Sequence, residues 1–139
     1  MNKASFSIES YKFDKVMIDL SNQKTNDIFI DFKPEGVFNS KEGTFELTFN
    51  FLALDSQETT VPFVEIRCVG LFKFENVNSL DEVPSFFYKN SIAILFPFLR
   101  AFVSIVTVQA NIKPIMLPTM NLSSLEEPLR ENTTEILAN

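Results

Sequence analysis

The sequence of 139 residues predicts a single α+β domain, with strands in the first two-thirds of the chain and helices in the last third. Apolar and polar residues alternate from Thr44 to Ala53 and from Val61 to Phe74, which is the period of a strand with one buried face. From about Ser91 to Asn111 the apolar residues recur at helical spacing instead. Strands followed by helices are typical of the α+β class.

The composition limits the possible classes of function. Hydrophobic residues make up 45% of the chain and charged residues 22%, which is enough apolar material for a core. The net charge of -6 argues against binding to nucleic acid, which needs a basic face. With only 3 glycines, we expect no glycine-rich phosphate loop and therefore no use of ATP. The first ten residues lack the apolar core of a signal peptide, so we predict a cytoplasmic protein.

Catalytic and metal-binding side chains are scarce. The chain has no histidine and a single cysteine, Cys68, so we expect no internal disulfide, no zinc site and no cofactor. Without histidine the usual general base is missing, and we predict that the protein is not an enzyme. Glu126 and Glu127 begin a predicted helix, where acidic residues complement the helix dipole, so we interpret them as structural.

The N-terminal segment predicts an interrupted strand. Apolar residues alternate with polar ones from Phe6 to Ile8, and the phase then shifts at Glu9 and Ser10. Such a shift predicts a bulge or a bend. The alternation resumes at Tyr11, and the polar stretch from Ser21 to Asp27 is expected to be a loop.

The two clearest strands form a predicted antiparallel hairpin. Phe45, Phe49 and the other apolar residues of the first strand fall on one face. The polar stretch from Asp55 to Thr60 then predicts a turn. The second strand has one apolar face, which includes Cys68, and one mixed face, so one side of the hairpin is expected to face the core and the other side to be partly wet.

The predicted long helix carries two apolar stripes. The first is Ile92, Leu95, Phe96, Leu99, Phe102, Val103 and Val106. The second is Ile94, Phe98, Ala101, Ile105 and Val108, followed by Ile112. A helix on a single sheet needs only one apolar face, so a second stripe predicts a second partner, most simply another copy of the chain. The alternative is a helix sandwiched inside a monomer, and the sequence does not decide which stripe is the seam between subunits. Arg100 and Pro97 argue against a membrane span.

The segment after the helix is expected to be extended and then briefly helical. Pro114 and Pro118 forbid a helix. Ser123 to Glu127 has the pattern of a capping box at the start of a short helix. Residues 131–139 are expected to be a frayed tail.

Several of these stretches resemble one family in their order and spacing. Leu95 to Arg100 is similar to the LFPY-x-R pattern at the start of the main helix of SecB proteins. Pro114 to Asn121 is similar to the family's proline-bracketed apolar stretch, and Asp31 to Glu35 resembles its Asp-Trp-x-Pro-Glu segment with Phe in place of Trp. Glu65, followed by Gly70 to Phe72, matches a family strand that ends in Gly-Ile-Phe.

The resemblance covers roughly residues 6–125 and implies a fold, an assembly and a function. The implied fold is a four-stranded antiparallel sheet with one long and one short C-terminal helix. The implied assembly is a homotetramer, a dimer of dimers packed through the long helix. The implied function is an ATP-independent chaperone that holds precursor proteins unfolded for the Sec export pathway. The short tail from Glu131 to Asn139 differs from the tail with which family members dock the SecA motor.

Other functions remain open on the sequence alone. One is a SecB-like chaperone of an antitoxin, and another is an oligomeric scaffold or interaction subunit whose apolar stripes are permanently buried. A carrier with an enclosed aromatic cavity is a further alternative, since the chain has 16 phenylalanines and no tryptophan. A Phe-rich core without a binding role would also account for that composition.

The resemblance also implies two sites. A client-binding groove would lie between the loop before the hairpin and the second helix, where apolar and adaptable side chains suit non-directional contact. Its residues would be Phe29, Phe32, Val37, Phe38, Met116, Leu117, Met120, Leu125 and Leu129. The alternative is that they close the core. Asp14 and Glu65 would form an acidic patch that contacts SecA, unless they serve only solubility.

Overall fold

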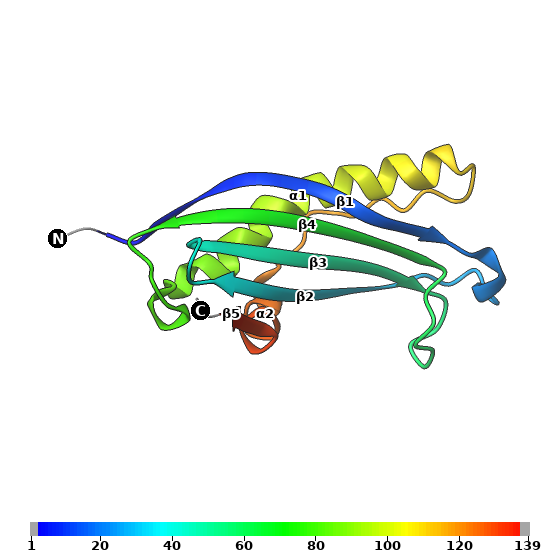
Figure 1. The fold of residues 1–139 in the computed structure, drawn as a ribbon. Helices are drawn as coiled ribbons and strands as arrows, with labels where there is room; N and C mark the ends of the chain where they lie inside the picture. Colours follow the sequence, from blue (N-terminus) through cyan, green and yellow to red (C-terminus); the bar gives the residue numbers. More distant parts are fainter. Residues whose placement is uncertain (1–2, 137–139) are drawn as a thin grey trace.

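One sheet with helices against one of its faces makes up the architecture (Figure 1). The computed structural model describes residues 3–136 of the chain. The strands are β1 (Ser5–Ile18), β2 (Phe29–Asn39), β3 (Thr44–Leu54), β4 (Val64–Glu75) and β5 (Thr133–Ile136). Their order in the sheet is β1-β4-β3-β2-β5; β1 to β4 pair antiparallel with one another, and β5 pairs parallel with β2. The expected four antiparallel strands are present, but the described sheet has five strands.

The predicted hairpin is β3 and β4, joined by the loop that contains Asp55 to Thr60. Strand β2 corrects an expectation, because the residues assigned to a loop before the hairpin lie in a regular strand paired with β3 along its whole length. Pro34 and Gly36 break the apolar alternation of β2 and so hide it in the sequence. Gly36 is required by close packing, since a Cβ there would collide with the ring of Phe45.

Strand β1 contains the predicted bulge and a second one. The pairing with β4 shifts register between Ile8 and Ser10, as predicted, and again between Phe13 and Lys15. Each bulge moves the alternation by one residue. As a result Phe13 keeps the same side of the sheet as Cys68, its partner on β4.

Helix α1 (Ser85–Gln109) starts earlier than the expected Ser91. Its cap residue is Pro84, which presets the backbone for a helix start although it offers no side-chain hydrogen bond. The first turns bury Phe87, whose ring packs against Phe45 and Phe72. The early start therefore adds an aromatic contact with the sheet that the sequence did not reveal.

The first apolar stripe of α1 packs on the sheet. Ile92, Leu95, Phe96, Leu99 and Val103 are buried there, and Phe102 and Val106 are half-buried. By length and composition alone α1 could also cross a membrane. In this fold the stripe instead joins a core rich in phenylalanine between α1 and the sheet.

Residues 112–122 run back along α1 in an extended path and lead to α2 (Glu126–Glu131) (Figure 1). The Ile115 amide donates to Oγ1 of Thr107 at 3.0 Å, which fixes this connector against the helix. The expected capping box does not form, because α2 starts at the end of a 3-10 turn and its cap residue, Leu125, makes no side-chain hydrogen bond. Arg130 of α2 lies over the ring of Tyr88, 4.4 Å from its centroid.

The expected frayed tail is instead α2's last residue, Glu131, followed by strand β5 as far as Ile136. The Gly36 amide donates to the Asn132 carbonyl at 3.1 Å, and the Ser40 amide donates to the Ile136 carbonyl at 3.2 Å. Hydrogen bonds to the free edge of β2 order this segment. Local sequence propensity does not predict such bonds, so the strand was not expected. The remainder of the expected tail, 137–139, lies outside the described residues.

Candidate functional site

Strand β2 divides the predicted groove residues between the two faces of the sheet. Successive side chains of a strand point to opposite faces. Phe32 and Phe38 pair with Phe51 and Phe45 of β3 and therefore face the helices. Phe29 and Val37 have the opposite parity and face away from α1, so the structure does not bring them together with the rest of the set.

The helix-side residues differ in how far they are accessible. Phe38, Leu117 and Leu129 are buried, with 0%, 5% and 0% of their surface exposed, and belong to the core. In contrast, Met116 is 69% exposed and Met120 is 37% exposed, both on the connector. The connector therefore presents apolar side chains that the core does not use.

Phe32 and Leu125 are half-buried between these two groups. The Phe32 ring packs against Phe49, with ring centroids 5.5 Å apart, and against Phe96 of α1 at 6.0 Å. One side of Phe32 reaches a pocket of about 320 Å³ where β2 meets α2. The pocket is lined by Phe32, Lys33, Pro34, Glu35, Asn50, Pro128 and Asn132. Phe32 thus links the core to an open, partly apolar hollow.

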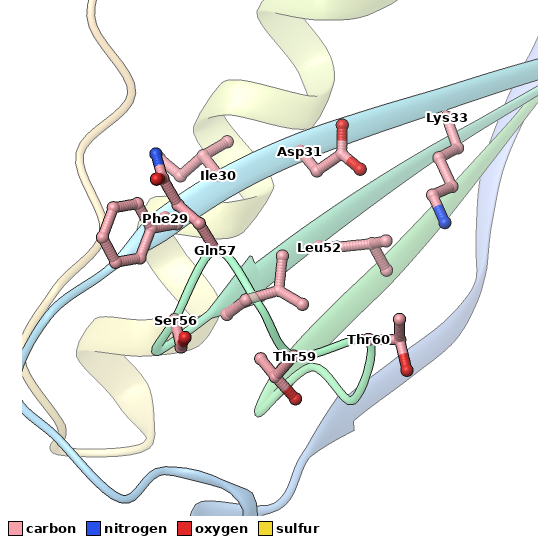
Figure 2. A pocket seen from close by; sticks show the side chains of 10 residues that line it. Phe29, Ile30, Asp31, Lys33, Leu52, Ser56, Gln57, Thr59 and Thr60 are labelled. Carbon is pink, nitrogen blue, oxygen red and sulfur yellow. The ribbon is translucent and has the colours of Figure 1, made fainter.

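A second pocket, of about 450 Å³, lies where β2 and β3 meet the loop between β3 and β4 (Figure 2). Phe29, Leu52 and Leu54 supply apolar lining from the two strands, and Asp31 and Lys33 add charge. Loop residues Ser56, Gln57, Thr59 and Thr60 complete the lining. Sequence reasoning missed this pocket, because it interpreted the loop only as a turn.

Asp55 holds that loop against the connection between β1 and β2. It is 6% exposed, and its carboxylate accepts hydrogen bonds from the backbone amides of Lys24 and Thr25, the latter at 3.1 Å. Oγ1 of Thr25 donates in return to the Asp55 carbonyl at 3.0 Å. A buried carboxylate that accepts hydrogen bonds from backbone amides is a stabilising cross-link, so it fixes the start of the loop that lines the second pocket.

The two predicted patch carboxylates are both paired with cations on the sheet face opposite α1. Arg67 Nε donates to Asp14 at 2.7 Å, and Lys15 Nζ donates to Glu65 at 3.0 Å. The hydrogen bond from Arg67, opposed by partial desolvation, lowers the pKa of Asp14 below its ordinary value. Asp14 and Glu65 are therefore brought together as a mixed charge network rather than as a purely acidic surface.

The second stripe of α1 is largely exposed. Ile105, Val108 and Phe98 are 58%, 50% and 39% exposed, Ala101 is exposed and Ile94 is half-buried. The stripe adjoins β1, where the ring of Phe13 stacks on Phe102 with centroids 4.0 Å apart. Within residues 3–136, Tyr11 of β1 covers part of Phe98, whereas Ile105 and Val108 stay exposed.

Cys68, in the middle of β4, shows none of the properties of a reactive thiol. It is fully buried, and burial raises the pKa of its thiol to about 12. Its place on the core side of β4 matches the prediction of an inert thiol.

Two known proteins are similar to the chain in sequence, and a third is similar in fold. The chain is 44% identical over 75 residues to an uncharacterized protein of Methanocaldococcus jannaschii, a match that covers 51% of this chain and 48% of that protein. It is 29% identical over 123 residues to the protein-export protein SecB of Aromatoleum aromaticum, covering 86% and 73%. The fold is similar to a SecB-like chaperone of Mycobacterium tuberculosis solved with a peptide of the HigA1 antitoxin (TM-score 0.66, 14% identity, 84% and 88% covered).

The matches cover different shares of the chain and of the similar proteins. The chain spans about half the length of the archaeal relative and most of the length of the Aromatoleum protein. A family model for the preprotein translocase subunit SecB matches residues 4–129, which include every strand except β5 as well as α1. The chain therefore belongs to the SecB family of chaperones.

Proposed function

We propose that the protein is an ATP-independent holdase that binds non-native proteins through apolar surface and keeps them competent for translocation. The observation that carries this proposal is the connector, where Met116 and Met120 are exposed beside a well-packed core. Methionine adapts its shape to different partners, and apolar contact does not depend on direction. Both properties suit clients of unrelated sequence.

The energetics of client binding favour a site built from several copies. Micromolar affinity needs about 8 kcal/mol. At about 25 cal/mol per Å², that requires more than about 300 Å² of apolar burial, before the costs of association and ordering raise the area several-fold. The hollow beside Phe32 has only three apolar lining residues, Phe32, Pro34 and Pro128, which cannot supply that area. Repeated sites on an assembly supply the rest by multivalency.

The second stripe of α1 is our proposed seam of that assembly, a homotetramer formed as a dimer of dimers. A contiguous exposed apolar stripe costs solubility unless a partner covers it. Phe98, Ile105 and Val108 would be buried by a second copy. Within this proposal the stripe is not a membrane-inserting surface, and the protein works in the cytoplasm.

Contact with SecA is part of the proposal through Asp14 and Glu65. Both carboxylates have cationic partners in the free chain, so SecA would have to exchange its own cations for Arg67 and Lys15. Such an exchange yields a weak, salt-sensitive contact. An antitoxin is the second candidate client, since the similar Mycobacterium tuberculosis chaperone was solved with an antitoxin peptide.

Aggregation of insulin under reducing conditions, without nucleotide, tests the holdase proposal. Reduced insulin chains aggregate, and a holdase at a comparable concentration should suppress the light scattering in a dose-dependent way. Adding ATP should change nothing. If scattering is unaffected and no other unfolded protein is retained, the chain is not a holdase, and an oligomeric scaffold becomes the better interpretation.

A further inference from the structure

The outer edge of β2 is occupied by the chain's own C-terminal segment. The amides of Gly36 and Ser40 donate to the carbonyls of Asn132 and Ile136. Alternate residues of a strand direct their hydrogen-bonding groups to the same side, so residue 38 also faces this edge. Pro34 has the same parity but carries no N–H, which explains why the pairing starts at Gly36. The edge at 36–40 is thus built to accept an extended segment.

The side chains of β5 fit this edge poorly. Thr133 and Glu135 pair with Gly36 and Phe38, on the face of the sheet that carries the core. Both residues are polar. Glu135 is half-buried, and its carboxylate accepts a hydrogen bond from the Leu80 amide at 3.0 Å. The one large apolar residue of β5, Ile136, has the opposite parity and is 53% exposed. An extended segment with apolar residues at the two core-side positions would bury more apolar surface here.

The attachment of β5 is also short. The strand has 4 residues, whereas α2 before it is anchored by the fully buried Leu129. Segments of this length at a sheet edge open at low cost in free energy. Release of β5 would therefore leave α2 and the core in place while it exposes the amides of Gly36 and Ser40.

We propose that the β2 edge at 36–40 is a strand-addition site for an extended, apolar segment of the client, and that β5 is a placeholder which the client displaces. The proposal rests on the holdase function and assigns it a second mode of contact. Main-chain hydrogen bonds at a sheet edge bind any sequence, whereas alternate side chains select apolar ones. A holdase for unrelated clients needs this combination. The pocket beside Phe32 lies next to Asn132, where an added strand would enter.

Residue-resolved hydrogen exchange on the full chain tests the displacement. The probe is reduced, carboxymethylated α-lactalbumin, which stays unfolded. On binding, the amides of Thr134 and Ile136 should lose protection, while those of Gly36 and Ser40 should keep it, because the client replaces β5. Retained protection in β5 with a bound client would overturn strand addition and leave the holdase proposal intact. Absence of client binding would overturn both.

A pair of truncations provides an independent measurement. A chain that ends at Asn132 lacks β5 and should bind the same probe several-fold more tightly, because the edge no longer has to be vacated. A matched chain that ends at Ile136 keeps β5 and should bind like the full chain. Equal or weaker binding by the shorter chain, when circular dichroism shows it folded, would refute the placeholder role. Client-induced exchange of β5 between copies, detected with isotope-labelled chains, would assign the edge to a second copy instead and equally refute it.

Discussion

Tyr11 of β1 stacks on Phe98 of α1, with ring centroids 4.2 Å apart and planes inclined by 20°. Both rings are also exposed, at 43% and 39%. The stack therefore joins the edge strand to the second stripe of α1 in one aromatic surface. A surface of this kind, on a small domain that already has a Phe-rich core, is the physical basis for expecting an assembly.

Substitution of Phe98 by Glu should dissociate the assembly. Burial of a carboxylate in an apolar seam without a partner costs several kcal/mol, at least about 2. Light scattering coupled to size exclusion should show the mass falling by about half or more, while circular dichroism stays unchanged. Ala93→Glu is the matched control, because Ala93 is exposed on the same helix outside the stripe. If both variants keep the wild-type mass, the second stripe is not the seam.

Replacement of the connector methionines by serine should weaken client binding without lowering the free energy of unfolding. Met116 and Met120 are exposed, so Met116→Ser and Met120→Ser together remove client contact and little core packing. We expect the Kd for carboxymethylated α-lactalbumin to rise by about tenfold, which is about 1.4 kcal/mol. Val61→Ser, at another exposed apolar residue, is the control and should leave the Kd unchanged.

Phe38 should behave differently from the connector methionines. It is fully buried, so Phe38→Ala should cost about 3–5 kcal/mol of unfolding free energy. Chemical denaturation measures this cost directly. Its effect on client affinity, once corrected for the unfolded fraction, should be small. A larger loss of affinity than of stability would return Phe38 to the groove.

Replacement of Arg67 by Gln should raise the pKa of Asp14. The hydrogen bond from Arg67 is the main cause that lowers this pKa below 3.8, so its loss should return the carboxyl toward that value. A carboxyl whose pKa is lower in the folded state than in the unfolded state stabilises the fold at any pH above its unfolded pKa. That stabilisation is lost as the pH falls through the folded pKa. In the Arg67→Gln variant the free energy of unfolding should therefore fall less as the pH is lowered. The difference should be small, because the Asp14–Arg67 pair is exposed.

Carboxyl chemical shifts across the acid range measure this prediction. Asp19 provides an internal control, since its pKa is lowered by hydrogen bonds from Ser21 and not by Arg67. The titration of Asp19 should be identical in both proteins. An unchanged Asp14 titration in the variant would mean that the Asp14–Arg67 pair does not persist in solution.

Local patterns in the sequence predict the elements whose signals are local. The alternation from Thr44 to Ala53 identifies β3, the phase shift at Glu9 identifies the first bulge, and helical spacing identifies most of α1. Strand β5 depends instead on an edge that lies about a hundred residues earlier in the chain, at Gly36 to Asn39. No short-range pattern carries that information.

The division of the predicted groove residues between two faces has a related cause. Once β2 is known to be a strand, the parity of Phe29 and Phe32 places them on opposite faces, and the groove set divides without further data. Pro34 concealed the strand because it breaks the alternation. The exposure of Met116, in contrast, was foreseeable from the prolines that hold the connector extended.

Gly36→Ala should destabilise the sheet more than Gly70→Ala, although both residues lie on the core side of central strands. A Cβ at Gly36 collides with the Phe45 ring and comes within 3.0 Å of Thr133 Oγ1, and a fully buried ring has little room to move. At Gly70 the nearest atom is the end of the Leu95 side chain, at 2.7 Å, so the overlap is smaller than at Gly36 and a smaller shift relieves it, although Leu95 is also fully buried. We expect a loss of about 1–3 kcal/mol of unfolding free energy for Gly36→Ala and a smaller loss for Gly70→Ala, measured by urea denaturation.

Because Thr133 belongs to β5, Gly36→Ala should also speed amide exchange at Thr134 and Ile136, whereas Gly70→Ala should not. Equal losses of stability with unchanged exchange in β5 would mean that Phe45 and Thr133 yield freely, and that Gly36 does not hold β5 in place.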